Sequence, residues 1–323
     1  MGVGTFIAAG RSLESAAKRA RRAEDLGYES VYVTHIAGRD SLTILAAYAT
    51  HTERIRLGTG VLPIYSRTPV ATAQQAITVD EISGGRVTLG LGVSHKPTVE
   101  GWYGSHIGKP VREMREYVGA IRAMLRGEQP PDNERFPTQF RFMGVEPRAD
   151  LPIYVAALSP GMLRAAGEIA DGVILWLCNP NYVRDVVVPE VTTGRERAGR
   201  TIEGFDVVAA VPSAVTDDPD GARNRLRGEL TTYFSLPFYR AMLERSGFGV
   251  DIERFDAKMA GGDAEAAVAE ISDEFLNVLG AIGSQEEAEA SVRRYLDAGA
   301  TSPCIGGISG TGFDDTLEAL APS

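Results

Sequence analysis

The chain has few cysteines, few histidines and a deficit of positive charge. Its 323 residues include 2 cysteines and 4 histidines, and 33 lysines and arginines stand against 43 aspartates and glutamates, for a formal net charge of -10. Cys178 and Cys304 are isolated, without a CxxC or other metal-ligand spacing, so the sequence predicts two buried, inert thiols rather than a disulfide framework or a zinc site. The acidic balance, with no basic run at either end, argues against nucleic acid or an anionic membrane as a partner.

Long apolar runs are also missing. No segment reaches about 18 consecutive apolar residues, and the amino end, MGVGTFIAAGRSLES, has no charged region followed by a long apolar one. We therefore expect a soluble cytoplasmic protein. The composition is 44% hydrophobic and 24% charged. With 323 residues, this hydrophobic share is sufficient for a sizeable folded core.

A short apolar run, a polar or glycine turn and an amphipathic helix recur along the chain. The third unit shows the pattern well, because Thr68 is a suitable N-cap, Pro69 suits the first helical position and Gly84 suits the helix end. The apolar runs that predict strands are residues 4–10, 30–35, 55–61, 86–93, 152–158, 171–177, 205–215 and 302–310.

Alternating strands and helices imply parallel strands joined by right-handed crossovers. A closed (β/α)8 barrel and an open doubly wound sheet both satisfy this pattern. The count of eight strands, with no composition break or linker between two halves, favours the barrel. We therefore predict one α/β domain over residues 1–323, in which residues 217–283 form an inserted helical region that acts as a lid over the barrel mouth.

In such a barrel, chemistry takes place where the strands end. The polar or small residues predicted at this rim are His35, Thr59, Gly60, Ser94, His95 and Lys96, with residues 159–162 and 306–309. His51 and His106 are more simply interpreted as solvated or structural. No HxH or carboxylate cluster appears at the strand ends, so we expect no metal.

The strand before His95 has one nearly bare face, because Gly90 and Gly92 alternate with bulky residues. Either a flat ligand lies on this face, or the glycines fit a crowded barrel interior and His95 is an ordinary turn residue; both interpretations stay open. The GLGVSH stretch lacks the third glycine of a dinucleotide-binding fingerprint and no helix follows at once, which argues against a Rossmann domain.

Three segments resemble the bacterial-luciferase-like superfamily, in particular its coenzyme F420-dependent oxidoreductases. They are SVYVTH, IRLGTGVLPIYSRTPVATAQQAITVDEISGGRVTLGLGVSHKPTVEGWYG and LPIYVAALSPGMLRAAGEIADGVI. The resemblance covers residues 4–200 and, more loosely, the region beyond residue 285. It implies the (β/α)8 TIM barrel of that superfamily and a homodimer formed through the second and third helices.

The resemblance also implies a cofactor site. GTGV matches the place of a non-prolyl cis peptide, here between Gly60 and Val61, behind the central ring of the deazaflavin. LSPGM matches a phosphate-contacting turn, and backbone N–H groups at a helix start beside Gly161 suit an anion. Ser159 as an ordinary N-cap, with Pro160 at the first helical position, predicts the same sequence. The residues implied to bind the cofactor are Thr59, Gly60, Val61, Ser94, His95, Ala157, Leu158, Ser159, Gly161 and Met162.

His95 and His35 are the catalytic residues that the resemblance implies. The sugar-phosphate dehydrogenases of the superfamily carry Asp-His after the second strand and Glu after the fourth, whereas this chain has Thr34 before His35 and Ser94 before His95, which argues against sugar oxidation. A reductase that passes hydride from reduced deazaflavin to an unsaturated or carbonyl acceptor fits better. His95 would donate the proton, since an imidazole near its unperturbed pKa can donate at neutral pH, and His35 would position ring or substrate.

Two other functions stay open at this point, an FMN-dependent luciferase-like monooxygenase and a non-catalytic barrel that binds a ligand. In each case the partner is a small molecule. The substrate pocket is expected to include Trp102, Tyr103 and the aromatic residues of TTYFSLPFYRAML, residues 231–243, which either line the pocket or pack the lid.

Overall fold

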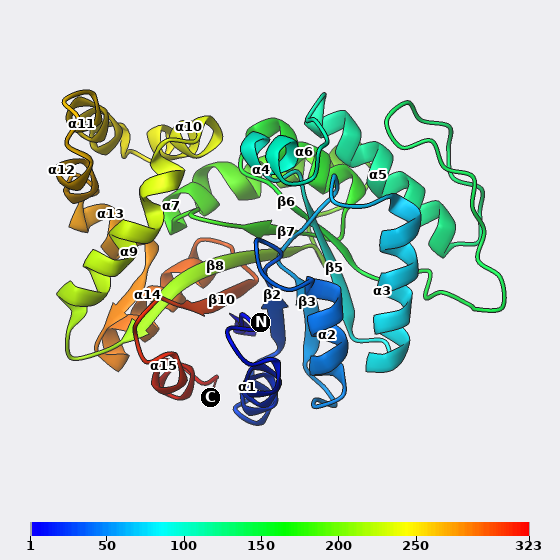
Figure 1. Cartoon of the computed structure of the whole chain (residues 1–323), viewed down its shortest axis with the longest axis horizontal. Coiled ribbons are helices and arrows are strands. Elements are labelled where there is room, and N and C mark those ends of the chain that lie inside the picture. The colour runs from blue at the N-terminus through cyan, green and yellow to red at the C-terminus, as the bar shows by residue number, and fades with distance from the viewer. Residues whose placement is uncertain (1, 323) are drawn as a thin grey trace.

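Eight parallel strands close into a barrel within residues 2–322, which the computed structural model describes (Figure 1). They are β1 (Gly4–Phe6), β2 (Ser30–Val33), β3 (Arg56–Thr59), β5 (Val87–Gly92), β6 (Ile153–Ala156), β7 (Gly172–Leu175), β8 (Asp206–Val215) and β10 (Ser302–Gly307). The ring closes because β10 pairs in parallel with both β1 and β8. Each of the eight predicted runs contains one barrel strand, so the predicted barrel is confirmed and the open sheet is excluded.

Helices surround the barrel. They are α1 (Leu13–Asp25), α2 (Ser41–Ala49), α3 (Pro69–Ser83), α5 (Pro110–Leu125), α6 (Pro160–Ile169), α7 (Pro180–Tyr182), a π-helical turn (Val183–Val187), α8 (Val188–Arg197), α14 (Gln285–Asp297) and α15 (Phe313–Ala319). The predicted start of α3 is confirmed, since the Thr68 side chain accepts from the N–H of Ala71 and Gly84 ends the helix with a φ of 70°. No described helix is long and apolar enough to cross a membrane.

The core has two parts. The larger part lies between the outward faces of the strands and the helices. The smaller one fills the barrel interior and consists of Tyr32, Tyr154, Ile174, Val208 and Cys304. Both cysteines are free and buried, as predicted, and burial raises the pKa of the Cys304 thiol to about 12.

Local departures from the prediction occur at the rim. The strand predicted over residues 55–61 ends at Thr59, and the chain pairs again with β5 only at β4 (Leu62–Pro63). The segment after His95, predicted as a loop, contains α4 (Lys96–Gly101), which Pro97 helps to start because its fixed φ suits the first helical turn. A further short strand, β9 (Ala281–Gly283), pairs with the end of β8.

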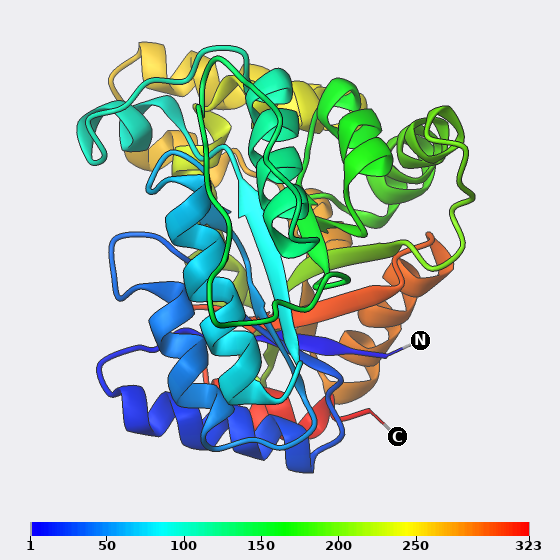
Figure 2. The ribbon, with the colours of Figure 1, turned by 90° about the vertical axis from the view of Figure 1, so that its right-hand side faces the viewer.

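Between β8 and β9 the chain is helical. It forms α9 (Pro219–Phe234), α10 (Pro237–Arg245), α11 (Gly249–Ala260), α12 (Ala264–Ala269) and α13 (Asp273–Leu279). These helices lie at the same end of the molecule as the segment that follows β5, seen at the top of Figure 2. The inserted region thus lies at the end of the barrel where the carboxyl end of β5 opens.

Candidate active site

Thr59 joins β3 to β5 where their pairing is interrupted. The ladder between these strands pairs Leu57 with Val87 and Gly58 with Thr88. Beyond it, the fully buried Thr59 hydroxyl donates to the carbonyl oxygen of Gly90 at 2.7 Å and accepts from its N–H at 2.9 Å. The hydroxyl therefore replaces ladder hydrogen bonds, and Thr59 supports the wall of the site instead of offering a side-chain atom to a ligand.

Gly60 and Val61 form that wall. The peptide bond between them is cis, as the resemblance implies. Both residues are half-buried, so they stay accessible from the barrel mouth. Gly60 also needs to lack a side chain, because a Cβ there would lie 2.5 Å from Cε1 of Phe6.

The face of β5 that carries Gly90 and Gly92 is crowded. A Cβ at Gly90 would lie 2.0 Å from the carbonyl oxygen of Thr59, and one at Gly92 would lie 2.5 Å from Cγ2 of Val61. This crowding explains both glycines without a ligand on that face, and it does not decide the role of His95.

His95 lies at the mouth, directly after β5. It is half-buried and precedes α4, and the preceding Ser94 has a left-handed φ of 58°. The imidazole packs against Tyr239 and Tyr233 of the inserted helices, with ring centroids 5.7 and 6.4 Å apart. Burial lowers the pKa of His95 below its ordinary value, so the expectation of an unperturbed imidazole is wrong. At neutral pH the ring is uncharged and offers an N–H hydrogen bond, but it carries no surplus proton.

His35 is held in one orientation after β2. Its side chain is 10% exposed, and its Nδ1 accepts the backbone N–H of Ser41 at 3.2 Å. Burial and the Arg67 guanidinium lower the pKa of His35, while Asp40, 3.6 Å from Nδ1, opposes the shift. Because Nδ1 is the acceptor, Nε2 carries the proton of the neutral ring. Arg67 pairs with Asp40 at 2.6 Å and so completes the support.

The turn before α6 leads into a helix start with open space beside it. The Ser159 side chain accepts from the N–H of Met162 at 3.4 Å, so Ser159 is an ordinary N-cap. Pro160 has no N–H, which leaves the N–H of Gly161 in the first turn, where a Cβ would meet no atom within 4 Å. This open space beside a helix start suits an anion. The predicted contacts Ala157 and Leu158 precede the turn, Ala157 buried and Leu158 half-buried.

Two buried donors after β7 lack partners. Trp176 Nε1 and Asn179 Nδ2 make no hydrogen bond to any described residue, although the Asn179 Oδ1 accepts from the N–H of Tyr182 at 3.0 Å. Buried donors without acceptors are costly. Asn179 comes just after a predicted strand, so the rule that placed His35 and His95 at the rim could have found it, whereas Trp176 lies inside the run predicted as a strand, residues 171–177. They are places where a ligand would supply acceptor atoms.

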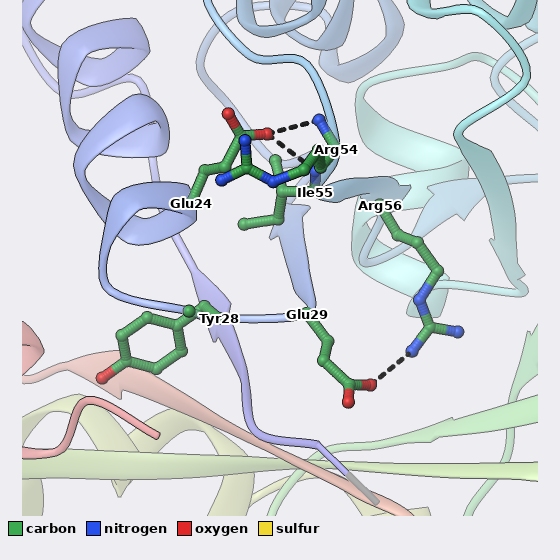
Figure 3. Close-up of a pocket in the computed structure, with 7 residues that line it drawn as sticks. Glu24, Tyr28, Glu29, Arg54, Ile55 and Arg56 are labelled. Atoms are coloured by element: carbon green, nitrogen blue, oxygen red, sulfur yellow. Dashed lines mark hydrogen bonds and ion pairs between the residues drawn. The ribbon is translucent and has the colours of Figure 1, made fainter. Parts of the chain in front are cut away.

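A separate pocket of about 360 Å³ lies at the opposite, amino end of the strands. Figure 3 shows its lining between the end of α1 and the starts of β2 and β3. The Glu24 carboxylate there accepts the backbone N–H groups of Glu53, Arg54 and Ile55, and Glu29 pairs with Arg56 at 3.4 Å. These charges are used within the protein, which fits the stabilising role of this end of a barrel. Among residues 2–322 no group of three or more His, Cys, Asp or Glu could hold a metal ion.

Comparisons with known proteins agree with this geometry. The profile of one family, described as luciferase-like monooxygenase, matches residues 1–302. The 5,10-methylenetetrahydromethanopterin reductase of Archaeoglobus fulgidus is 31% identical over 305 residues, which cover 92% of this chain and 91% of that protein.

Solved structures share the barrel. The coenzyme F420-dependent tetrahydromethanopterin reductase from Methanopyrus kandleri aligns with a TM-score of 0.84 at 24% identity, over 99% of this chain and 97% of that one. An F420-dependent secondary alcohol dehydrogenase in complex with an F420-acetone adduct aligns with a TM-score of 0.78 at 17% identity, with the same coverage of 99% and 97%. At these identities the two structures establish the fold.

Proposed function

This chain is an enzyme of the luciferase-like monooxygenase family, and from that premise we propose that it transfers hydride from reduced coenzyme F420 to a small organic acceptor. The choice of cofactor is supported by a relative from Mycobacterium tuberculosis that is 30% identical over 301 residues, which cover 86% of this chain, and whose name describes a putative coenzyme F420-dependent oxidoreductase. Because the chain belongs to a family of enzymes, the interpretation as a non-catalytic barrel that binds a ligand is set aside.

The residues at the mouth fit such a cofactor, which has a flat ring edged by carbonyl groups and a tail that carries a phosphate. The open N–H of Gly161 would receive the phosphate, because a helix start favours an anion. Gly60 and Val61 would support the back of the ring. The unpaired amide of Asn179 would gain an acceptor atom. When bound, the reduced cofactor supplies the hydride.

The two histidines would act as neutral donors. His35, whose Nδ1 accepts the N–H of Ser41, keeps its proton on Nε2 and would orient a carbonyl of ring or substrate with it. His95, uncharged because burial lowers its pKa, would donate an N–H hydrogen bond to the acceptor oxygen, where negative charge develops as hydride arrives. Tyr233 and Tyr239 cover His95 and would keep water from that oxygen.

The proposal is supported above all by the order of the strands, because β3, β5 and β6 are parallel neighbours and so bring Gly60, His95 and Gly161 to the same end of the barrel. The test is anaerobic oxidation of reduced F420 with a panel of ketones and enones. We expect turnover, and we expect His95→Gln to lower kcat about 100-fold. His51→Gln is the control, since that side chain is exposed just after α2 and before the start of β3.

The FMN-dependent monooxygenase is the second candidate, because the matching family is described by that activity. It predicts the opposite result in the same assay. Reduced FMN with oxygen would support product formation, whereas reduced F420 would not be consumed.

A further inference from the structure

Four rings meet above the barrel mouth and form what we call the aromatic cluster, which consists of His95, Trp176, Tyr233 and Tyr239. Tyr233 lies near the end of α9 and Tyr239 in α10, and their centroids are 4.8 Å apart. Trp176, after β7, lies 5.9 Å from Tyr233. The inserted helices therefore meet the two strand ends, β5 and β7, through flat side chains.

The aromatic cluster is uncharged. Burial lowers the pKa of His95 and raises those of Tyr233 and Tyr239, so all three rings are neutral at pH 7. In the part of the chain that the structure describes, no lysine or arginine contributes to these pKa shifts. Two cations are next to members of the aromatic cluster along the chain, and both have acidic partners: Lys96 is 75% exposed and 3.8 Å from Glu100, and Arg240 pairs with Asp256. An anionic ligand would find no counter-charge here.

The charge that acts on Tyr233 is negative. Glu229 of α9 contributes to the raised pKa of Tyr233, and its carboxylate accepts the N–H of Ser309 at 2.7 Å, which fixes it near the mouth. A carboxylate at this place disfavours a second anion. The electrostatic setting thus disfavours an anionic ligand.

Trp176 supplies one polar group to this apolar surface. Its indole N–H is buried and makes no hydrogen bond of ordinary distance and angle. The same N–H lies near the Tyr233 hydroxyl and opposes the rise in the pKa of Tyr233. Trp can only donate, so a ligand oxygen would satisfy it. A site built to donate to an oxygen discriminates strongly against ligands that lack one.

We propose that the aromatic cluster selects the hydride acceptor and that this acceptor is an uncharged, planar α,β-unsaturated carbonyl compound. Its flat face packs on Tyr239, and its carbonyl oxygen accepts from Trp176 Nε1–H and from the N–H of His95. The inference rests on the proposed function. In the reaction the C=C π bond breaks, Cβ gains a hydride and Cα gains a proton from water. The acceptor is thereby reduced by two electrons as reduced F420 is oxidised.

Trp176 makes the test direct, because the chain has 2 tryptophans and the other, Trp102, is 56% exposed on the surface. In a Trp102→Phe background, Trp176 is the only indole fluorophore. We expect 2-cyclohexenone to quench its fluorescence with saturation, and the carboxylated analogue 3-oxocyclohexene-1-carboxylate to bind about tenfold more weakly or worse. This readout needs no turnover.

Tyr239 and its neighbour Phe238 provide a matched pair. Tyr239 is buried in the aromatic cluster, whereas Phe238 is 63% exposed. Tyr239→Leu is expected to raise the Kd of the enone about tenfold, since two ring contacts are lost, while Phe238→Leu leaves it unchanged. Tyr239→Phe keeps the ring and should bind as the parent does, which separates loss of the ring from misfolding.

The inference is overturned if the carboxylate binds as tightly as the enone, or if Tyr239→Leu and Phe238→Leu behave alike. A titration with F420 on the same protein separates the two proposals. Binding of F420 without enone quenching overturns this inference alone. Absence of F420 binding overturns the proposed function, whatever the enone does.

Discussion

Replacement of Thr59 by valine tests how the wall of the site is supported. Valine has almost the shape of threonine, so the change leaves no cavity, but it removes the hydroxyl that both donates to and accepts from the backbone of Gly90. Gly90 is buried in β5 at a point where β3 no longer pairs with it. Its N–H and its carbonyl oxygen would both lose their hydrogen-bond partner.

The expected loss follows from those two groups. Each buried backbone group left without a partner costs about 1–3 kcal/mol, so Thr59→Val should lower the free energy of unfolding by about 2–6 kcal/mol. A domain is stable by about 5–15 kcal/mol. The variant should therefore still fold while it loses a large part of its stability, because the valine methyl cannot take over either hydrogen bond.

Urea unfolding measures this loss as a lower midpoint at an unchanged slope. Thr78→Val is the matched control, since the exposed Thr78 hydroxyl donates only to the Gln74 carbonyl of its own helix at 2.8 Å. That change should stay within about 0.5 kcal/mol of the parent. If Thr59→Val also falls within that range, the hydroxyl does not replace the ladder and the account of the wall is wrong.

Three further predictions concern the mouth. Burial lowers the pKa of His95, and the neutral ring is the active form, so kcat/KM should be constant above about pH 6.5 and fall as the pH drops through the lowered pKa. His95→Gln should abolish this dependence. A rate that instead falls as the pH rises would mean that the imidazolium acts. Gly161→Ala has room for its Cβ, so the thermal midpoint of this variant should match that of Gly119→Ala, a change at another glycine with open space. The affinity of Gly161→Ala for F420 should nevertheless drop about tenfold. Unchanged affinity would contradict anion binding beside Gly161. Gly92→Ala places a Cβ 2.5 Å from Cγ2 of Val61, so this variant should lose about 1–3 kcal/mol of stability and also bind the cofactor more weakly. A variant equal to the parent in both properties would show that the Val61 side chain can move aside without cost.

The barrel was predictable because its signals are local. Hydrophobic period, caps such as Thr68 and glycine ends such as Gly84 are each decided within one helix or strand. The rim histidines followed from the same pattern, since His35 and His95 come just after predicted strands. The cis bond at Gly60 came from resemblance alone, because nothing in the residue pattern GTGV requires it.

The rest of the site depends on contacts between distant parts of the chain. The role of Thr59 needs Gly90, 31 residues away, and no periodicity links the two. The lowered pKa of His95 reflects burial, and the rings that cover it, such as Tyr239, come from an insertion whose placement the sequence does not specify. Trp176 was hidden for a different reason, because an apolar-looking residue at a strand end was taken as part of the strand.

A calorimetric titration of the purified protein with F420 and with FMN, each oxidised and reduced, decides which cofactor the enzyme uses. We expect F420 to bind with a Kd of about 1 μM or tighter, equivalent to about 8 kcal/mol, and FMN to bind at least about tenfold more weakly. Preference for FMN would place the enzyme among flavin monooxygenases, and binding of neither would contradict the cofactor site at Gly60 and Gly161.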